Sequence, residues 1–219
     1  MEIIKMLPYF LVVLNFAIFI PASVLDIKYR EVPLWYWYVG SKIGLVVSIL
    51  AFSFYYPIKV LLIYYSISIF SVLGLLIAYL MGHMGAGDLW ASIFLALSLP
   101  INPFGGFLPP ILLTLLIASI LELLTRTILT VKDCRNMKLN KRCLSAAPIK
   151  ARELLNNKKY RWYFAQKSTK NISIDEPHET IIEESNGNLN EIVWAQPGLP
   201  YILFILISLP ISLIVSTII

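Results

Sequence analysis

Charged side chains are scarce in this sequence. Asp, Glu, Lys and Arg make up 14% of its 219 residues, against about 25% in an ordinary soluble domain. Hydrophobic residues reach 58% and the mean hydropathy is +0.75, above the roughly 45–50% apolar content of soluble domains. The composition therefore excludes an ordinary soluble domain and predicts an all-α polytopic membrane protein, a bundle of transmembrane helices.

Histidine and cysteine are also rare, with two of each in the chain. Cys134 and Cys143 lie nine positions apart, a spacing that fits neither a zinc motif nor a disulfide framework. His83 has no second histidine or cysteine nearby in the sequence, which favours an interfacial polar residue over a metal ligand. We therefore expect no metal site and no cofactor.

Long apolar runs are abundant instead. We expect about six transmembrane helices, because each needs roughly 20 residues, and we expect the first to be a retained span rather than a signal peptide. The fourth run is too short to cross a bilayer alone, so either its helix tilts or residues 100–103 continue at membrane depth, shielded by other helices. The expected spans are residues 8–25, 34–54, 60–80, 89–99, 107–124 and a last span from about Trp194 to Ile219.

The few charges are unevenly distributed, with a basic tract over 126–170 and an acidic tract over 175–191. Basic residues favour the cytoplasmic side, so the net charge of +5 indicates membrane orientation rather than a nucleic acid partner. We expect both termini outside and the three charged connections in the cytoplasm. The expected division is a membrane domain over 1–125, a cytoplasmic segment over 126–196 and a sixth transmembrane helix over 197–219.

One stretch of the basic tract has two open interpretations. Residues 151–166 combine basic side chains with Trp162, Tyr163 and Phe164, a pattern typical of a short amphipathic helix lying on anionic membrane lipid. A solvated loop explains the same composition equally well.

Two aspartates border apolar runs on the expected cytoplasmic face. Asp88 ends the segment 84–88, which contains Gly85 and Gly87, and Asp26 begins the polar connection after the first span. Taken alone, Asp88 is equally well explained as a helix cap, since a carboxylate there accepts bonds from free N–H groups. Ionisable residues at the edges of spans are costly and usually functional, so the matching pair favours a shared site.

Such a pair of carboxylates suits peptide hydrolysis. Two neighbouring carboxylates in a poorly hydrated site cannot both ionise easily, so one serves as the acid and the other as the base. The base activates a water molecule for attack on a peptide carbonyl, and the acid protonates the carbonyl oxygen. Gly85 and Gly87 fit this scheme because a substrate backbone can come close to residues without side chains.

The sequence resembles the prepilin peptidase family, in its archaeal preflagellin and prepilin peptidase branch. The resemblance lies in the Gly-x-Gly-Asp motif at 85–88, in the Asp26 connection that ends at Pro33, and in the segment 194–200 before the last span. It implies a six-span aspartic endopeptidase whose catalytic residues match Asp26 and Asp88. It also implies that pilin-like or archaellin precursors are cut at the cytoplasmic face, between a short basic leader and the apolar helix that follows.

Two features depart from that family's pattern. The chain has no Cys-x-x-Cys pair, so the methyl transfer of bacterial relatives is not supported. Trp90 stands two positions after Asp88, where relatives often carry lysine. Neither departure affects the two aspartates.

Charge complementarity suggests further substrate-binding residues. Acidic groups attract a basic leader, so we expect Glu31, Glu122 or the tract at 175–191 to steer it. Lys42 lies about two turns into the second span, where a lysine usually extends to the interface. A role for Lys42 in substrate binding beside the carboxylates is the alternative, and the oligomeric state is open.

Three other interpretations also remain open. Asp26 and Asp88 are compatible with an ion-coupled transporter, although no broken-helix pair or internal repeat accompanies them. A non-enzymatic membrane scaffold would recruit a soluble partner through 126–196. An intramembrane protease of the presenilin type shares the Gly-x-Gly-Asp motif but carries its partner aspartate deep inside a preceding span.

Overall fold

The computed structural model describes residues 2–81, 84–134, 146–157, 160, 163–165 and 192–218. The chain divides into two compact units, of which the first contains Met1–Ser119 and Pro200–Ile219 and the second contains Ile120–Leu199. His83, Trp162 and the acidic tract at 175–191 lie outside the described residues.

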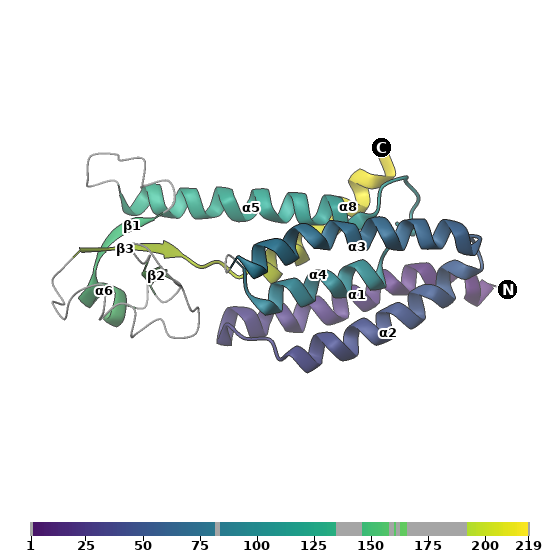
Figure 1. Cartoon of the computed structure of the whole chain (residues 1–219), viewed down its shortest axis with the longest axis horizontal. Coiled ribbons are helices and arrows are strands. Elements are labelled where there is room, and N and C mark those ends of the chain that lie inside the picture. The colour runs from purple at the N-terminus through teal and green to yellow at the C-terminus, as the bar shows by residue number, and fades with distance from the viewer. Residues whose placement is uncertain are drawn as a thin grey trace. The chain divides into compact units, whose positions relative to one another are not determined.

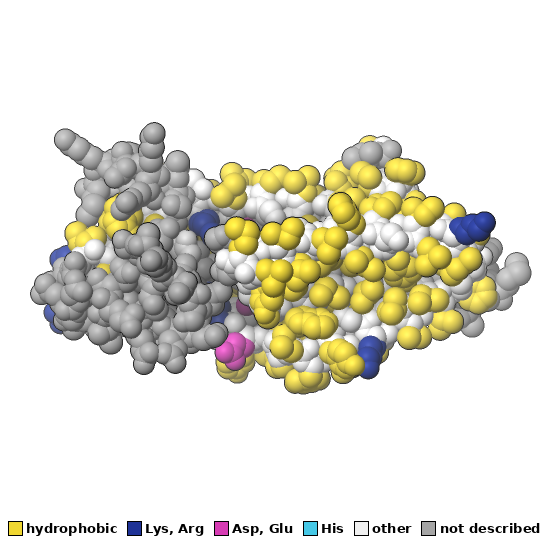
Figure 2. All heavy atoms as spheres, in the orientation of Figure 1, with side chains coloured by type: hydrophobic (Ala, Val, Ile, Leu, Met, Phe, Trp, Pro, Cys, Tyr) yellow, Lys and Arg dark blue, Asp and Glu magenta, His cyan; other side chains and the backbone are white. Residues whose placement is uncertain are grey.

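The first unit is a bundle of helices (Figure 1). Within the described residues, five helices are long and apolar enough to cross a membrane, and a further apolar helix is short. The long helices are α1 (Glu2–Tyr29), α2 (Leu34–Ser53), α3 (Ile58–Leu80), α5 (Pro110–Asp133) and α8 (Tyr201–Ile218), and the short one is α4 (Ala86–Ser98). From Ile120 onward, α5 belongs to the second unit. Apolar side chains cover most of the bundle's visible face in Figure 2. The predicted polytopic helix bundle is confirmed.

Proline marks the start of several helices. Pro33 and Pro57 occupy the N-cap positions of α2 and α3, with φ angles of −55° and −61°, and Pro110 is the first residue of α5. The fixed φ of proline suits a helix start, and its missing N–H has no intrahelical partner there. These helix starts follow directly from the local sequence.

α1 is longer than predicted. The sequence placed Asp26 in a polar connection after residue 25, but the helix continues to Tyr29 because Lys28 suits the negative end of the helix dipole. Arg30 then adopts the left-handed conformation, with φ of 64°, and its N–H donates to the carbonyl of Asp26 at 3.0 Å. This bond matches an αL C-cap, so Asp26 lies in the last turn of α1 rather than in a loop.

α4 is the central helix of the bundle and contacts α1, α2, α3 and α8. On α2, the buried residues Gly40, Gly44 and Ser48 are spaced four apart, which places small side chains on one face. A Cβ atom at Gly44 would lie 2.7 Å from the Cβ of Ser98. The close approach of α2 to α4 therefore depends on glycine at this position.

The chain leaves the helical form after α4 and stays buried. Ile101 is 1% exposed and Asn102 is 2% exposed. The Asn102 amide donates to the Leu213 carbonyl and the Ser216 hydroxyl of α8, and its oxygen accepts from the Phe104 N–H. Non-helical chain is tolerated inside a membrane protein where the protein satisfies its polar groups. α8 therefore shields the chain after the short fourth run, which is the shielding that the second of the two expected arrangements requires.

The second unit contains a small antiparallel sheet that the sequence did not predict. Its strands are β1 (Ala147–Lys150), β2 (Tyr163–Ala165) and β3 (Ile192–Pro197), in the order β1-β3-β2. Burial alternates along β3, as expected for a strand that covers a core with one face. That core is formed by Ala147, Ile149, Ala151, Leu154, Tyr163, Val193 and Ala195.

This sheet corrects two predictions. Residues 151–166 do not form one amphipathic helix, because α6 (Ala151–Asn156) is short and Tyr163 lies in β2. Trp194 does not begin the last span, because it lies in β3 and α8 begins at Tyr201. Both errors have one cause, since the partner strands are far apart in the sequence and their pairing leaves no local signal.

Cys134 corrects a third prediction. It is fully buried and disulfide-bonded, whereas the cysteine spacing suggested no disulfide. The Cys134 sulfur lies 3.8 Å from the carbonyl oxygen of Ala146, twelve residues further along the sequence. Spacing in the sequence does not reveal a contact of this kind.

Tyr163 provides a pH test of the second unit. Its hydroxyl donates to the Asp133 carboxylate at 2.8 Å, and burial together with Asp133 raises the pKa of Tyr163. In the unfolded chain a tyrosine ionises near pH 10.0, so the stability due to neutral Tyr163 is fully present below that pH and is lost as the pH rises.

We expect the free energy of unfolding to fall more steeply above pH 10 in the wild type than in Tyr163→Phe. Denaturant titrations between pH 8 and pH 11.5, at intervals of about half a pH unit, measure the free energy of unfolding of both proteins and check this difference. All other ionisable side chains are common to both proteins. Equal slopes would contradict a raised pKa for Tyr163.

Candidate active site

Asp26 is held in place by the start of another helix. It lies in the last turn of α1 and is 8% exposed. Its carboxylate accepts a hydrogen bond from the backbone N–H of Ile202, in the first turn of α8. Free N–H groups and the positive end of the helix dipole favour a negative charge at such a position. The N-terminus of α8 thus orients and stabilises this carboxylate.

Arg30 is a neighbour of Asp26 that the sequence did not single out. Its guanidinium interacts electrostatically with the Asp26 carboxylate, and its backbone closes α1 through the left-handed cap described above. A left-handed conformation is uncommon for a residue other than glycine. No local sequence signal indicates this conformation. In the sequence, Arg30 looks like any basic residue of a cytoplasmic connection.

Asp88 lies in the first turn of α4 and is half-buried. Gly85 is the N-cap of this helix, and the Oδ2 atom of Asp88 lies 3.5 Å from the position a Cβ at Gly85 would take. The carboxylate therefore turns back toward its own helix start, where the dipole favours it. The helix-cap interpretation and a functional role are compatible, because the dipole of α4 favours a negative charge at this position in either case.

The two aspartates lie at the same end of the bundle. The C-terminal end of α1 and the N-terminal ends of α4 and α8 lie together there (Figure 1), and α1 contacts α4. Beyond Glu2, the acidic residues of the first unit are Asp26, Glu31 and Asp88. All three belong to this end, which makes it the acidic end of an otherwise apolar bundle. Across the described part of the chain, no three His, Cys, Asp or Glu residues are grouped to hold a metal ion.

The two glycines of the motif are not needed for the backbone conformation. Gly85 has φ of −75° and ψ of 153°, which any residue adopts, and Gly87 lies inside α4. A Cβ at Gly87 would meet no atom within 4 Å. The space above Gly87, next to Asp88, is open, so this glycine leaves room beside the carboxylate.

Gly87→Ala tests whether a substrate uses this room. We expect the variant to fold at least as stably as the wild type, because alanine favours a helix, and to lower kcat/KM for cleavage by about 10- to 100-fold. Cleavage kinetics and thermal unfolding of the same preparation check both parts. Gly74→Ala is the matched control, since a Cβ at Gly74 also meets no atom within 4 Å. Unchanged kinetics for Gly87→Ala would contradict a substrate path over this residue.

The predicted substrate-binding residues are placed in different surroundings. Glu31 is exposed and lies just after α1, at the acidic end. Lys42 is exposed on α2, with its ammonium 4.1 Å from the centroid of the Tyr38 ring, as a snorkelling lysine would be. Glu122 belongs to the second unit and pairs with Arg126 one turn further along α5. A role in substrate binding stays a prediction for all three.

The model of the type IV leader peptidase family matches residues 13–127, more than half of the 219-residue chain. The matched range contains Asp26, Asp88 and most of the helical bundle. No curated protein matches the chain.

Proposed function

The chain belongs to the type IV leader peptidase family, and from this premise we propose that it is an aspartic endopeptidase with Asp26 and Asp88 as its catalytic pair. It is a multi-pass membrane peptidase, and pilin-like precursors are the substrate class of its family. One observation carries the assignment of the pair: the acidic end of the bundle holds both aspartates, each beside the N-terminus of a helix. Both also lie inside the matched range.

The proposed reaction is a direct attack by water. The pair shares one proton, because two carboxylates in a poorly hydrated site do not both ionise. The ionised aspartate removes a proton from water, the hydroxide attacks the peptide carbonyl, and the protonated aspartate donates to the carbonyl oxygen. The aspartate that took the proton from water then gives it to the leaving nitrogen as the carbon–nitrogen bond breaks. A hydroxyl group of the intermediate returns its proton to the other aspartate, so the pair again holds one proton. The N–H of Ile202 and the N-terminus of α4 stabilise the carboxylate charges during these steps.

We place the cut at the cytoplasmic face, between a short basic leader and the apolar helix that follows it. Basic residues accumulate in 126–170, and basic connections favour the cytoplasm. In this scheme, 1–125 is the membrane domain, the segment from 126 to 196 is cytoplasmic, and α8 (Tyr201–Ile218) is the last transmembrane helix. Glu31, at the acidic end, suits the attraction of a basic leader. Pilin and archaellin precursors both fit this description.

Cleavage of a defined precursor tests the proposal. The precursor carries a short basic leader ending in glycine, followed by an apolar helix, and is mixed with the purified full-length protein in lipid vesicles. We expect a single cut at the leader boundary, identified by mass spectrometry of both products. A precursor with acidic residues in place of the basic ones is expected to be cut more slowly, with the difference shrinking at high salt.

The outcomes separate the alternatives. A cut at the leader boundary supports the peptidase. Intact precursor under conditions where the protein is folded would contradict the proposed substrate. A cut that persists in both Asp26→Asn and Asp88→Asn would leave the peptidase standing and overturn the proposed catalytic pair.

A further inference from the structure

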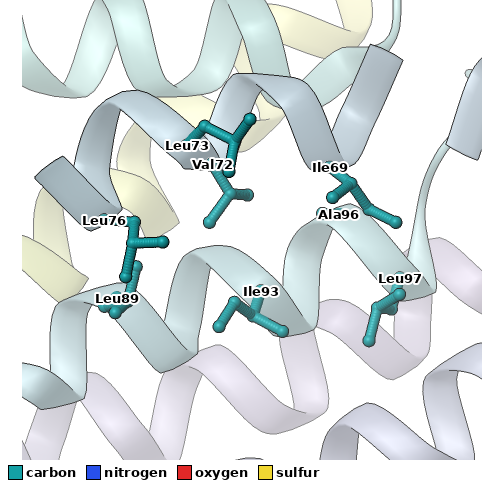
Figure 3. Close-up of a pocket in the computed structure, with 8 residues that line it drawn as sticks. All are labelled: Ile69, Val72, Leu73, Leu76, Leu89, Ile93, Ala96 and Leu97. Atoms are coloured by element: carbon teal, nitrogen blue, oxygen red, sulfur yellow. The ribbon is translucent and has the colours of Figure 1, made fainter. Parts of the chain in front are cut away.

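An apolar groove lies between α3 and α4. It has a volume of about 290 Å³ and is lined by eight aliphatic residues, four from each helix (Figure 3). No polar or charged side chain contributes to the lining. In Figure 3, Leu76 of α3 and Leu89 of α4 lie next to each other at one end of the groove.

The lining follows helical periodicity on both sides. On α3, the lining residues span positions 69–76 with spacings of three and four, and on α4 they span 89–97 in the same way. Such spacing puts them on one face of each helix. The α4 stretch is about 12 Å long, at roughly 1.5 Å per residue. Two parallel stripes of this kind offer ridges and a cleft against which the side chains of a further helix can pack.

The groove reaches the first turn of α4, the turn that contains Asp88. Leu89 lines it and directly follows Asp88 in the first turn of α4. An apolar helix that lay along the groove would therefore have one end at the first turn of α4, which contains Asp88 and Gly87. No other apolar residue of the lining is adjacent in sequence to a carboxylate.

We propose that this groove receives the apolar helix of the precursor and so sets the position of the scissile bond. The inference rests on the proposed function, because only a leader peptidase has a substrate whose apolar helix begins directly after the cut. Packing of that helix along α3 and α4 brings the preceding bond to Asp88 and leaves the basic leader at the acidic end. The groove thereby recognises the apolar side of the cut, while charge recognises the leader.

A variant that fills the groove gives the kinetic test. Ile93→Trp is compared with the wild type on two substrates, the full precursor and a short peptide that keeps the leader and the cut but lacks the apolar helix. We expect the KM for the full precursor to rise by about 10-fold or more, with kinetics on the short peptide unchanged. Leu62→Trp is the matched control, because Leu62 is 59% exposed on α3 and lies outside the groove.

Photo-cross-linking tests the occupant directly and does not depend on a filled groove folding correctly. A photoreactive amino acid replaces Leu73, which lines the groove and is 44% exposed, or Leu62 as the control. Asp88→Asn in both proteins keeps the precursor uncut. We expect adducts with the precursor's apolar helix from position 73 and not from position 62.

Each result decides the proposal. Adducts from position 73 with lipid alone or with a second copy of the chain overturn it, as do equal precursor adducts from both positions. If the wild type cuts both substrates and Ile93→Trp behaves like it, the groove assignment fails and the proposed function stands. If the wild type cuts neither substrate, the proposed function fails and the groove assignment fails with it.

Discussion

Replacing either Asp26 or Asp88 with asparagine is expected to lower kcat/KM for leader cleavage by about 10²- to 10⁴-fold, the usual contribution of a general acid or base. Asparagine keeps the shape of the side chain but cannot take or give the proton. In Asp26→Asn the amide oxygen still accepts a bond from the Ile202 N–H, so the helix end should remain in place. Initial rates at several precursor concentrations, in vesicles with equal amounts of protein, measure the effect.

The matched control is Glu2→Gln, a substitution at the first residue of α1. It is expected to cut at the wild-type rate. The double variant should lose little more than either single variant, because residues that act as a unit are not additive. If the decrease in kcat/KM of the double variant equals the product of the two single decreases, the aspartates do not act as a shared catalytic pair. Normal thermal unfolding of all variants excludes misfolding as the cause.

Gly44→Leu is expected to cause the largest loss of stability, about 3 kcal/mol or more. Even a Cβ at this position would come within 2.7 Å of Ser98 Cβ and 3.3 Å of its Cα, so α2 and α4 must move apart. Ser98 offers no flexible side-chain end that can yield. Reversible unfolding in mixed detergent micelles, followed by circular dichroism, measures the change in the free energy of unfolding.

Gly74→Leu is the control for this prediction. It makes the same substitution within the bundle helix α3, where an added Cβ meets no atom within 4 Å. We expect its stability to equal or exceed that of the wild type, since leucine favours a helix more than glycine does. If both variants unfold alike, the close packing of α2 on α4 does not limit the stability of the bundle.

Much of the architecture follows from the sequence alone. Apolar runs of about 20 residues have few alternatives to transmembrane helices, and proline at Pro33, Pro57 and Pro110 fixes where three of them begin. The glycine-rich segment before Asp88 indicated a helix start, and α4 begins there. The same local patterns drew attention to both aspartates. All of these features depend on residues that are neighbours in the chain, so a local pattern is enough to predict them.

Only the tertiary structure decided what surrounds these residues. The bond from the Ile202 N–H to Asp26, the shielding of Asn102 by α8, and the sheet that includes Trp194 all join segments far apart in the sequence. The groove between α3 and α4 also joins two separate helices. In the sequence, the residues that line it cannot be told apart from other apolar residues of a transmembrane helix. Composition and periodicity determined that the chain forms apolar helices with two carboxylates at their ends. Packing determined which helix end stabilises each carboxylate and which faces remain open, since those depend on the shapes of surfaces that meet only after folding.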